Sequence, residues 1–336
     1  MKAMLLREIG GPGQLKLEEV EMPTPGQGEV VVRLQAAALN RRDLMVVYGR
    51  YPGIKLPGIP GSDGAGEVAA IGDGVGTVMV GDQVIINPGL HWGDDRTKKR
   101  PDFAVLGVPK DGTYAQFVKV PAENIYAKPA HLSWEEAAAL PLAGLTAYRA
   151  LVTKGQLKKG ELVLIPGASG GVATYLVQFA AALGAEVFVT SSKDEKIERA
   201  KSIGAAGGVN YTSENWAEDL MRLTGGIDLS VDSIGGEVFN TLLTLGNIGS
   251  RIVSFGSTRG PVPNLFLPNM TVKEISVIGS TMGSPQDFSD MIKLVEEHKI
   301  HPILDSIFPL QDAAEALVRM ERGENFGKIV LTIPKD

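Results

Sequence analysis

The most constraining feature of the sequence is a turn of small residues that joins an apolar run to a helix. Residues 161–165 are mostly apolar, and Pro166-Gly167-Ala168-Ser169-Gly170-Gly171 leads from them into residues 172–183, which carry no charge. A strand, a tight glycine turn and a helix form the context that a dinucleotide-binding fingerprint requires. Small residues let the backbone approach a pyrophosphate, and the helix N-terminus offers free N–H donors to its phosphates.

The fingerprint departs from its strict form. Its register is Ala168-x-Gly170-x-x-Ala173, so the first glycine is replaced by alanine, whereas alanine is permitted at the last position. A strand–helix turn whose glycines serve only packing therefore remains an alternative at this point.

The next expected strand ends in Thr190-Ser191-Ser192-Lys193, about 20 residues after the glycines, where enzymes that bind NAD usually carry an acid. The first acid here is Asp194. Hydroxyls and an ammonium suit a 2′-phosphate that a carboxylate would repel, so the sequence favours NADP(H). Alternatively, Ser191 and Ser192 only cap the helix that begins at Asp194.

Strands and helices alternate through this part of the chain, which predicts a parallel sheet covered on both faces. Residues 204–208 are rich in glycine and are predicted to form a loop. The expected strands are 161–165, 185–190, 227–232, 251–255 and 275–278, and the expected helices are 172–183, 194–203, 216–223 and 238–245.

The first third of the chain is rich in glycine and proline and predicts a β-rich, barrel-like domain. Ser133 and Glu136 form a capping-box pattern ahead of an alanine-rich helix. A final strand at 328–333 is expected to pair with this domain. The expected strands of the first third are 2–6, 15–20, 29–37, 66–71, 83–86 and 114–120, and helices are expected at 288–298 and 313–320.

Charge and composition narrow the class of protein. The net charge of −6 gives no broad attraction to nucleic acid or to an anionic membrane, and the basic run Arg96-Thr97-Lys98-Lys99-Arg100 is expected to be a solvated loop. The absence of cysteine excludes disulfides, thiolate nucleophiles and cysteine-based zinc sites. No apolar stretch approaches the ~20 residues of a membrane span, so we expect a cytoplasmic protein.

Five segments together resemble the zinc-independent medium-chain dehydrogenases/reductases, in particular the quinone oxidoreductase-like and zinc-type alcohol dehydrogenase-like proteins. The resemblance covers nearly the whole chain and depends on the order and spacing of the segments. They are residues 39–43 (Leu-Asn-Arg-Arg-Asp), 61–68 (Gly-Ser-Asp-Gly-Ala-Gly-Glu-Val), 111–115 (Asp-Gly-Thr-Tyr-Ala), 143–148 (Ala-Gly-Leu-Thr-Ala-Tyr) and 327–331 (Gly-Lys-Ile-Val-Leu).

The resemblance implies an α/β fold: a doubly wound parallel Rossmann sheet plus a β-rich GroES-like barrel domain. We expect the catalytic domain at 1–124 and 300–336 and the NADP-binding domain at 125–299. In zinc-dependent relatives a Cys, a His and another Cys stand at the places of Asn40, Ser62 and Leu142, and four further Cys form a lobe that residues 90–107 replace. Because these ligands are missing, the sequence predicts neither catalytic nor structural zinc.

Without a metal ion, hydrogen-bond donors must stabilise the oxygen that gains charge during hydride transfer. Asn40 is the first candidate, because its amide replaces a metal ligand. Tyr51 is the second, although its ring could instead stack in a turn with Pro52. Asp43 is expected to fix the loop of Asn40 by backbone hydrogen bonds.

The resemblance also implies a set of cofactor contacts. Thr146 is expected near the nicotinamide ribose, and Lys193 and Tyr211 at the adenosine phosphate. Asp63 and Lys328 are expected to form an ion pair behind the cofactor. The full set is Thr146, Ala168, Ser169, Gly170, Gly171, Val172, Ser191, Ser192, Lys193, Tyr211, Gly256, Ser257, Asn325 and Lys328.

The function implied is hydride transfer from NADPH to a quinone or to an α,β-unsaturated carbonyl. One alternative is a 2-enoyl thioester reductase, for which Arg96–Arg100 and Arg41-Arg42 could form a basic entrance. Another is an NADPH-binding structural or RNA-binding protein without enzymatic activity. The apolar residues 275–278 would be an exposed edge strand, which favours a homodimer.

Overall fold

The computed structural model describes residues 1–335 and divides into two units, Gly144–Gly283 and the remainder of the chain. Six parallel strands form the sheet of the unit Gly144–Gly283, in the order β12-β11-β10-β13-β14-β15. Numbered along the chain this order is 3-2-1-4-5-6, the doubly wound arrangement in which ligands bind at the carboxyl ends of the strands. The strands are β10 (Leu162–Pro166), β11 (Glu186–Ser191), β12 (Gly207–Asn210), β13 (Ile227–Asp232), β14 (Gly246–Ser254) and β15 (Ser276–Gly279).

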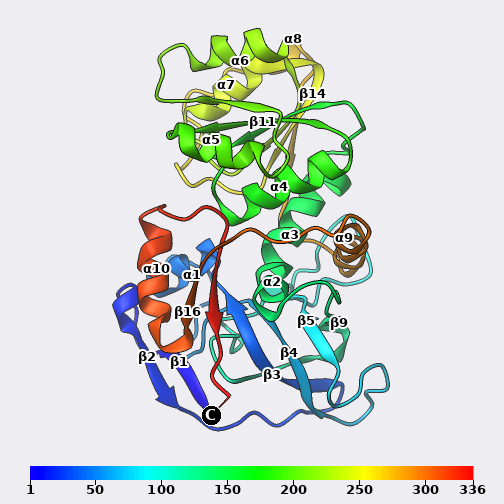
Figure 1. Ribbon diagram of the computed structural model, residues 1–336, viewed down its shortest axis with the longest axis vertical. Helices are drawn as coiled ribbons and strands as arrows, with labels where there is room; N and C mark the ends of the chain where they lie inside the picture. Colours follow the sequence, from blue (N-terminus) through cyan, green and yellow to red (C-terminus); the bar gives the residue numbers. More distant parts are fainter. Residues whose placement is uncertain (336) are drawn as a thin grey trace. The chain divides into compact units, whose positions relative to one another are not determined.

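Helices connect successive strands of this sheet (Figure 1). Strands β10 and β13 lie at its centre and are buried along almost their whole length, as expected for a parallel sheet with both faces covered. The helices are α4 (Gly171–Ala182), α5 (Asp194–Lys201), α6 (Trp216–Thr224), α7 (Val238–Leu245) and α8 (Leu267–Val272). Helix α3 (Pro141–Tyr148) and a π-helical segment (Arg149–Lys154) precede them.

One prediction for this unit is wrong. Gly207 and Gly208 do not lie in a loop but begin β12, which pairs in parallel with β11. A Cβ atom on Gly208 would lie 2.7 Å from the carbonyl oxygen of Val189, and one on Gly207 would lie 3.0 Å from the Phe188 ring. The glycines therefore permit a close approach between strands, whereas sequence rules interpret a glycine cluster as a loop.

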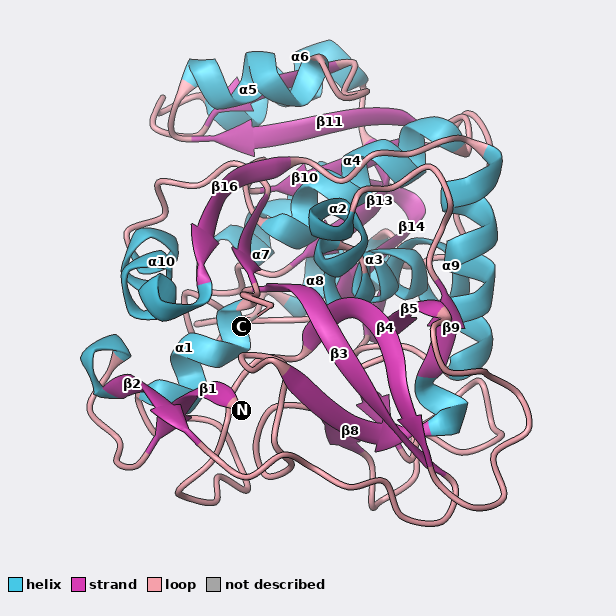
Figure 2. Ribbon diagram, turned by 60° about the horizontal axis from the view of Figure 1, so that its bottom comes forward, coloured by secondary structure: helices cyan, strands magenta, loops and turns pink. Residues whose placement is uncertain are grey.

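The other unit is built on a seven-stranded sheet. Its order is β16-β17-β3-β4-β5-β9, and β8 pairs with β3 beyond this path. The long strands β3 and β4 run side by side (Figure 2). The strands of this unit are β1 (Lys2–Leu6), β2 (Leu15–Glu19), β3 (Glu29–Ala38), β4 (Asp63–Ile71), β5 (Gln83–Ile86), β6 (Gly89–Leu90), β7 (Ala104–Val105), β8 (Phe117–Pro121), β9 (Ile125–Ala127), β16 (Leu304–Pro309) and β17 (Lys328–Thr332).

Strand β17 pairs with β3, with Val330 opposite Ala38. This confirms that the last strand of the chain joins the sheet of the first third, as the sequence predicts. Strand β16 is an addition that the sequence analysis did not contain. The unit boundaries fall at 143/144 and 283/284, and the predicted domain limits at 124/125 and 299/300 remain a prediction about folding domains.

Two helix starts show how local sequence sets the fold. The predicted capping box is present, since Ser133 Oγ accepts from the Glu136 N–H and Glu136 Oε2 accepts from the Ser133 N–H. Ser284 and Asp287 form a second box that starts its helix three residues earlier than expected. The helices of this unit are α1 (Arg41–Val47), α2 (Trp134–Ala139), α9 (Pro285–Glu297) and α10 (Ala313–Glu321).

No helix within residues 1–335 is both long enough and apolar enough to cross a membrane.

Asp305 anchors the turn that leads into β17. Its Oδ1 accepts from the Phe326 N–H at 2.9 Å, and its Oδ2 accepts from Arg319 Nε at 2.8 Å and from Ser306 Oγ at 2.9 Å. Burial alone would raise the pKa of Asp305, but these hydrogen bonds outweigh it and lower the pKa. The carboxylate therefore stabilises the fold above the usual titration range of aspartate, and this stability is lost as the pH falls through the lowered pKa.

We expect Asp305→Asn to lower the free energy of unfolding by about 1–3 kcal/mol at neutral pH, because a carboxylate that accepts three hydrogen bonds is replaced by a neutral amide. The difference from the wild type should begin to shrink below about pH 4, where the carboxyl becomes protonated in the unfolded chain, and should vanish below the lowered pKa of the folded state. Urea unfolding followed across this pH range measures both values. A difference that stays constant with pH would show that the charge of Asp305 does not contribute.

Candidate functional site

A group of buried polar side chains lies around the start of α1. Asn40 precedes the helix, Ser62 and Asp63 stand at the start of β4, and Lys328 begins β17. All of these residues are at most 9 % exposed. We refer to them as the Asn40 cluster, which consists of Asn40, Arg42, Asp43, Ser62, Asp63, Tyr114 and Lys328.

Asp43 holds the backbone of Asn40. Its Oδ2 accepts from the Asn40 N–H at 2.8 Å and from the Tyr114 hydroxyl at 2.7 Å. Burial raises the pKa of Asp43, while the nearby Arg42 and these two donors oppose the rise. Burial, together with the charge of Asp43, raises the pKa of Tyr114 well above its usual value, so the phenol acts as a donor. This is the backbone support that the sequence predicts for Asp43.

The side chain of Asn40 lies between an acid and a base. Its Nδ2 donates to Asp63 Oδ2 at 2.9 Å, and its Oδ1 accepts from Lys328 Nζ at 2.7 Å. Lys328 and Asp63 form the expected ion pair at 3.0 Å. The second oxygen of Asp63 accepts from the Leu142 N–H at 2.8 Å. Three segments that are far apart in the sequence are thus joined at Asn40.

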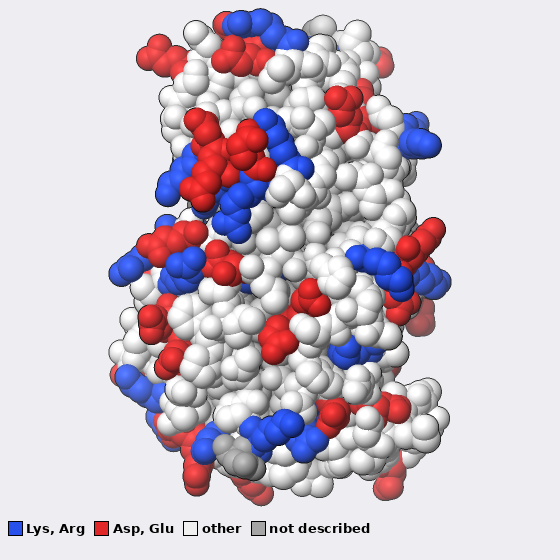
Figure 3. Space-filling model, viewed as in Figure 1, with Lys and Arg blue, Asp and Glu red and all other residues white. Residues whose placement is uncertain are grey.

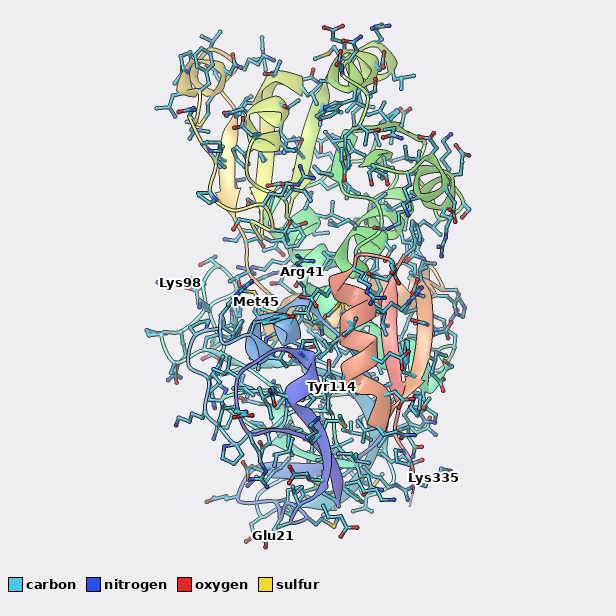
Figure 4. The ribbon with its side chains drawn as sticks, turned by 90° about the vertical axis from the view of Figure 1, so that its left-hand side faces the viewer. Glu21, Arg41, Met45, Lys98, Tyr114 and Lys335 are labelled. Atoms are coloured by element: carbon cyan, nitrogen blue, oxygen red, sulfur yellow. The ribbon has the colours of Figure 1, made fainter. Side chains whose placement is uncertain are left out.

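Arg42 occupies the other side of the cluster. Its Nη1 donates to Ser62 Oγ at 2.6 Å and to the carbonyl oxygens of Leu106 and Gly107. The guanidinium carbon lies 4.3 Å from the centre of the half-buried Tyr51 ring, a cation–π contact. The sequence did not predict this contact, because an arginine beside a second arginine normally indicates a solvated helix face. Arg41 and Met45 do lie on the exposed side of α1 (Figure 4).

Zinc-dependent relatives carry their three zinc ligands at the positions of Asn40, Ser62 and Leu142. The groups found at these positions here do not fit a zinc ion. The Oδ1 of Asn40 accepts from an ammonium, and Ser62 Oγ accepts from a guanidinium while donating to Leu106 O. Leu142 has no side-chain donor atom. Two buried cations beside these oxygens oppose a dication, and zinc requires nitrogen, sulfur or carboxylate ligands. Within residues 1–335, no three His, Cys, Asp or Glu side chains gather as metal ligands.

Aromatic packing and ion pairs organise the segment that stands in place of the four-cysteine lobe. Trp92 is buried and packs with Phe103 in a T-shaped arrangement, with 5.3 Å between ring centres. Arg96 pairs with Asp287 and Asp290 at the start of α9, and Arg100 pairs with Asp102. Lys98 stands at the exposed surface of this segment (Figure 4). The cations of the basic run are therefore largely paired, and Figure 3 shows acidic and basic side chains interspersed on the face in view.

In the other unit, the glycine turn adopts the geometry of a phosphate cradle. Gly167 has a φ of +80°, and the N–H groups of Gly167 and Ala168 donate to Thr190 O at the end of β11. Gly170 caps α4 without a side-chain hydrogen bond, so the first N–H groups of this helix stay open to a ligand. A Cβ atom on Gly170 would meet nothing within 4 Å. Ser169 completes the turn, and Gly171 and Val172 are the first residues of α4.

The expected 2′-phosphate residues lie together at the carboxyl ends of β11 and β12. The helix cap of α5 is Lys193, with no side-chain cap hydrogen bond, so Ser191 and Ser192 do not cap this helix. Ser191 Oγ instead accepts from the Lys193 N–H, and the Tyr211 N–H donates to Ser191 O. Ser192 and Lys193 are exposed.

Sequence reasoning missed two cations in this unit. Lys196 Nζ donates to Ser169 Oγ at 3.1 Å, which links α5 to the glycine turn. The guanidinium carbon of Arg259 lies 5.8 Å from the centre of the Tyr211 ring. Lys196 lies in the first turn of an expected helix, and this position could have indicated that its side chain reaches the glycine turn. No local sequence signal indicates that Arg259 lies near Tyr211.

The remaining predicted residues lie in either unit. Thr146 is buried in α3, and Gly256 and Ser257 follow β14. Asp232, at the end of β13, holds the turn that follows that strand, because its carboxylate accepts from the Ile234 and Gly235 N–H groups. Burial raises the pKa of this carboxyl. Asn325 donates to Gly327 O at 2.9 Å, just before Lys328.

Comparison with known proteins defines the family. Residues 26–130 match the alcohol dehydrogenase GroES-like domain, and residues 171–297 match the family of zinc-binding dehydrogenases. A zinc-type alcohol dehydrogenase-like protein of Schizosaccharomyces pombe is 37% identical over 337 residues, which covers 97% of each chain. An acryloyl-coenzyme A reductase of Sulfurisphaera tokodaii is 31% identical, over 98% of this chain and 99% of its own. The crystal structure of an NAD-dependent alcohol dehydrogenase superposes with a TM-score of 0.95 at 38% identity, covering 99% of this chain and 100% of that one.

The chain is therefore a medium-chain dehydrogenase/reductase, an oxidoreductase with a GroES-like domain and a parallel Rossmann sheet. Within that class it belongs to the zinc-type alcohol dehydrogenase-like proteins. The predicted fold class is confirmed, and a nicotinamide cofactor is expected for such an enzyme. The residues of the glycine turn fit this cofactor, because they combine an open helix N-terminus with a cradle that a side chain would fill.

The open position of Gly170 provides a test of the cradle. We expect Gly170→Ala to weaken binding of the nicotinamide cofactor about tenfold or more, because the added methyl group occupies the space that a pyrophosphate would take. The free energy of unfolding should change by less than about 1 kcal/mol, since the methyl meets no protein atom and only the helix cap is affected.

Gly76→Ala is the matched control, because a Cβ atom at Gly76 also meets nothing within 4 Å but lies in the other unit. Calorimetric titration with the cofactor and urea unfolding of both variants measure the two effects. Equal affinities in the two variants would contradict a phosphate site at this turn.

Proposed function

We propose that this protein is an NADPH-dependent, zinc-independent oxidoreductase that transfers hydride to a quinone or to the β-carbon of an α,β-unsaturated carbonyl. The observation that carries the proposal is the side-chain amide of Asn40, which stands where zinc-dependent relatives bind the metal. It is held between Lys328 and Asp63 and keeps a donor hydrogen. A fixed hydrogen-bond donor can stabilise a substrate oxygen that gains negative charge.

Zinc independence is supported by the chemistry of the three ligand positions. The side-chain oxygens of Ser62 and Asn40 already accept hydrogen bonds from Arg42 and Lys328, respectively. Those two cations would repel a metal ion. Stoichiometric zinc in protein that has been washed with a chelator would overturn this part of the proposal.

Selectivity for NADPH is supported by the end of β11. Ser191, Ser192 and Lys193 offer hydroxyls and a positive charge, and no acid precedes Asp194 in this segment. Lys196 and Arg259 add positive charge to the same part of the unit. The proposal differs from the NAD dependence in the name of the alcohol dehydrogenase compared above, so it requires a direct measurement.

We expect isothermal titration to give NADPH at least a tenfold lower dissociation constant than NADH, a difference of about 1.4 kcal/mol. Lys193→Ala should remove much of this preference. It should leave the affinity for NADH unchanged, because NADH lacks the 2′-phosphate that Lys193 is proposed to contact. Lys201→Ala is the control, since Lys201 lies on the same helix but pairs with Glu198. Equal affinities for the two cofactors in the wild type would contradict the proposed selectivity.

In the proposed reaction, Asn40, Asp43 and Tyr51 act on the substrate directly or through one another. NADPH, when bound, supplies the hydride. As the hydride reaches the β-carbon, charge develops on the carbonyl oxygen, which accepts a hydrogen bond from Asn40 Nδ2. Asp43 fixes the backbone beneath this amide. The resulting enolate then takes a proton from Tyr51, whose ring rests against Arg42, or from water.

Asn40→Ala should lower kcat by about 10²–10³-fold, the usual effect of removing one donor to a developing oxyanion. The dissociation constant of NADPH should stay near the wild-type value, because the glycine turn and the end of β11, which would hold the cofactor phosphates, belong to the other unit. Steady-state turnover with 1,4-benzoquinone and fluorescence titration with NADPH measure the two quantities. Wild-type turnover in this variant would remove Asn40 from the reaction.

Reduction of 2-enoyl thioesters is the second candidate, favoured by the 31% identity to an acryloyl-coenzyme A reductase. The basic entrance expected for it has weak support, because Arg42 is buried and Arg96 and Arg100 pair with acids. Comparing turnover on crotonyl-coenzyme A with that on a simple quinone separates the two substrates. NADPH binding without turnover on any carbonyl or quinone would instead support a structural or RNA-binding role.

A homodimer remains part of the proposal. Strand β15 is the last strand of its sheet, and its residues are largely exposed, including Val277 at 44%. Pairing with a second copy would cover its unpaired backbone groups. A monomeric mass by light scattering at micromolar concentration would contradict this. The cytoplasmic location remains a prediction.

A further inference from the structure

The orientation of the Asn40 amide follows from the charges on either side of it. Lys328 can only donate hydrogen bonds and Asp63, when ionised, can only accept them. The amide oxygen must therefore face Lys328 and the amide nitrogen must face Asp63, which is the arrangement observed at 2.7 and 2.9 Å. With the amide flipped, donor would face donor and acceptor would face acceptor, so this pair of charges permits one orientation.

Lys328 has no hydrogen left for another partner. Its ammonium carries three N–H groups, and they have three acceptors at 2.7–3.0 Å: Leu39 O, Asn40 Oδ1 and Asp63 Oδ2. The residue is 2% exposed. A direct contact between this ammonium and a cofactor phosphate would require breaking one of these buried bonds.

Asn40 itself retains one unused donor. One hydrogen of Nδ2 goes to Asp63, and the other has no acceptor within residues 1–335. Asn40 stands at the N-cap of α1, and its side-chain amide bonds to two residues that are far away in the sequence, Lys328 and Asp63. These two charged partners fix the direction in which the amide points.

We propose that Lys328 is a positioning residue that acts through Asn40: its ammonium, bonded to Asn40 Oδ1 and paired with Asp63, fixes and polarises the amide so that the free Nδ2 hydrogen meets the substrate oxygen. The inference rests on the proposed function. It assigns Lys328 to the side-chain amide of Asn40, which would contact the substrate, instead of to the cofactor. A charge-assisted bond to the amide oxygen draws electrons from the nitrogen and strengthens its N–H as a donor.

A double-mutant cycle tests the assignment with Asn40→Ala, Lys328→Met and the variant that carries both, using 1,4-benzoquinone as acceptor. Lys328→Met should lower kcat about 10²-fold, the scale of a misplaced catalytic group, with the NADPH dissociation constant within twofold of wild type. In the Asn40→Ala background the same change should cost less than threefold, because its target is gone. Lys328→Arg should restore part of the loss, since a guanidinium can still donate to Oδ1.

Lys328→Met leaves Asp63 buried without its counterion, so the variant could fail to fold. Asp63→Asn/Lys328→Met removes both charges together and serves as the second test, with folding checked by circular dichroism. If folded, this variant should keep the low kcat, because the Asn40 amide no longer receives a hydrogen bond from the Lys328 ammonium. Wild-type turnover in it would overturn the proposal.

The outcomes separate the two levels of the argument. Losses that multiply in the double variant, or a tenfold weaker affinity for NADPH in Lys328→Met, overturn the role of Lys328 and leave Asn40 as the donor. Unchanged turnover in Asn40→Ala overturns the proposed function and the role of Lys328 with it.

Discussion

The buried ion pair between Lys328 and Asp63 is the interaction on which the Asn40 cluster depends. It joins the start of β17 to the start of β4, and Asn40 lies between the two charges. Burying charges costs free energy unless each finds an opposite charge and further hydrogen bonds. Here the ammonium has three acceptors, and each oxygen of Asp63 accepts at least one hydrogen bond, so the pair satisfies that condition and fixes the strands around it.

The cluster as a whole balances two buried acids against two buried bases. Asp43 and Asp63 face Arg42 and Lys328, and the neutral groups Ser62 and Tyr114 complete the hydrogen bonding. In a zinc-dependent relative a metal ion supplies positive charge at this place. Here Arg42 and Lys328 place two buried cations at the corresponding positions, and in the proposed zinc-independent reaction they take the place of the metal charge.

Much of the fold was predictable because local signals agreed with the final structure. Strands β10, β11 and β13 fell within one or two residues of the expected limits, since the apolar runs of β10 and β11 end at a glycine or at polar residues and β13 alternates apolar and polar residues. The capping box at Ser133 was predictable because it depends only on two residues three positions apart, Ser133 and Glu136. Gly207 and Gly208 were misassigned because their role depends on the neighbouring strand: the close approach to Val189 is invisible in a local window. Strand β16 was missed because its pairing partner, β17, lies beyond any such window.

The sequence by itself determined the doubly wound sheet, the glycine turn and the absence of cysteine ligands, because each depends on residue type and on short-range spacing. Only the tertiary structure decided what surrounds Asn40. Lys328 stands 288 positions away along the chain, and the contact exists because β17 returns to pair with β3. The burial of Arg42 beside Ser62 and Tyr51 was likewise decided by packing, since adjacent arginines carry no signal of which one turns inward.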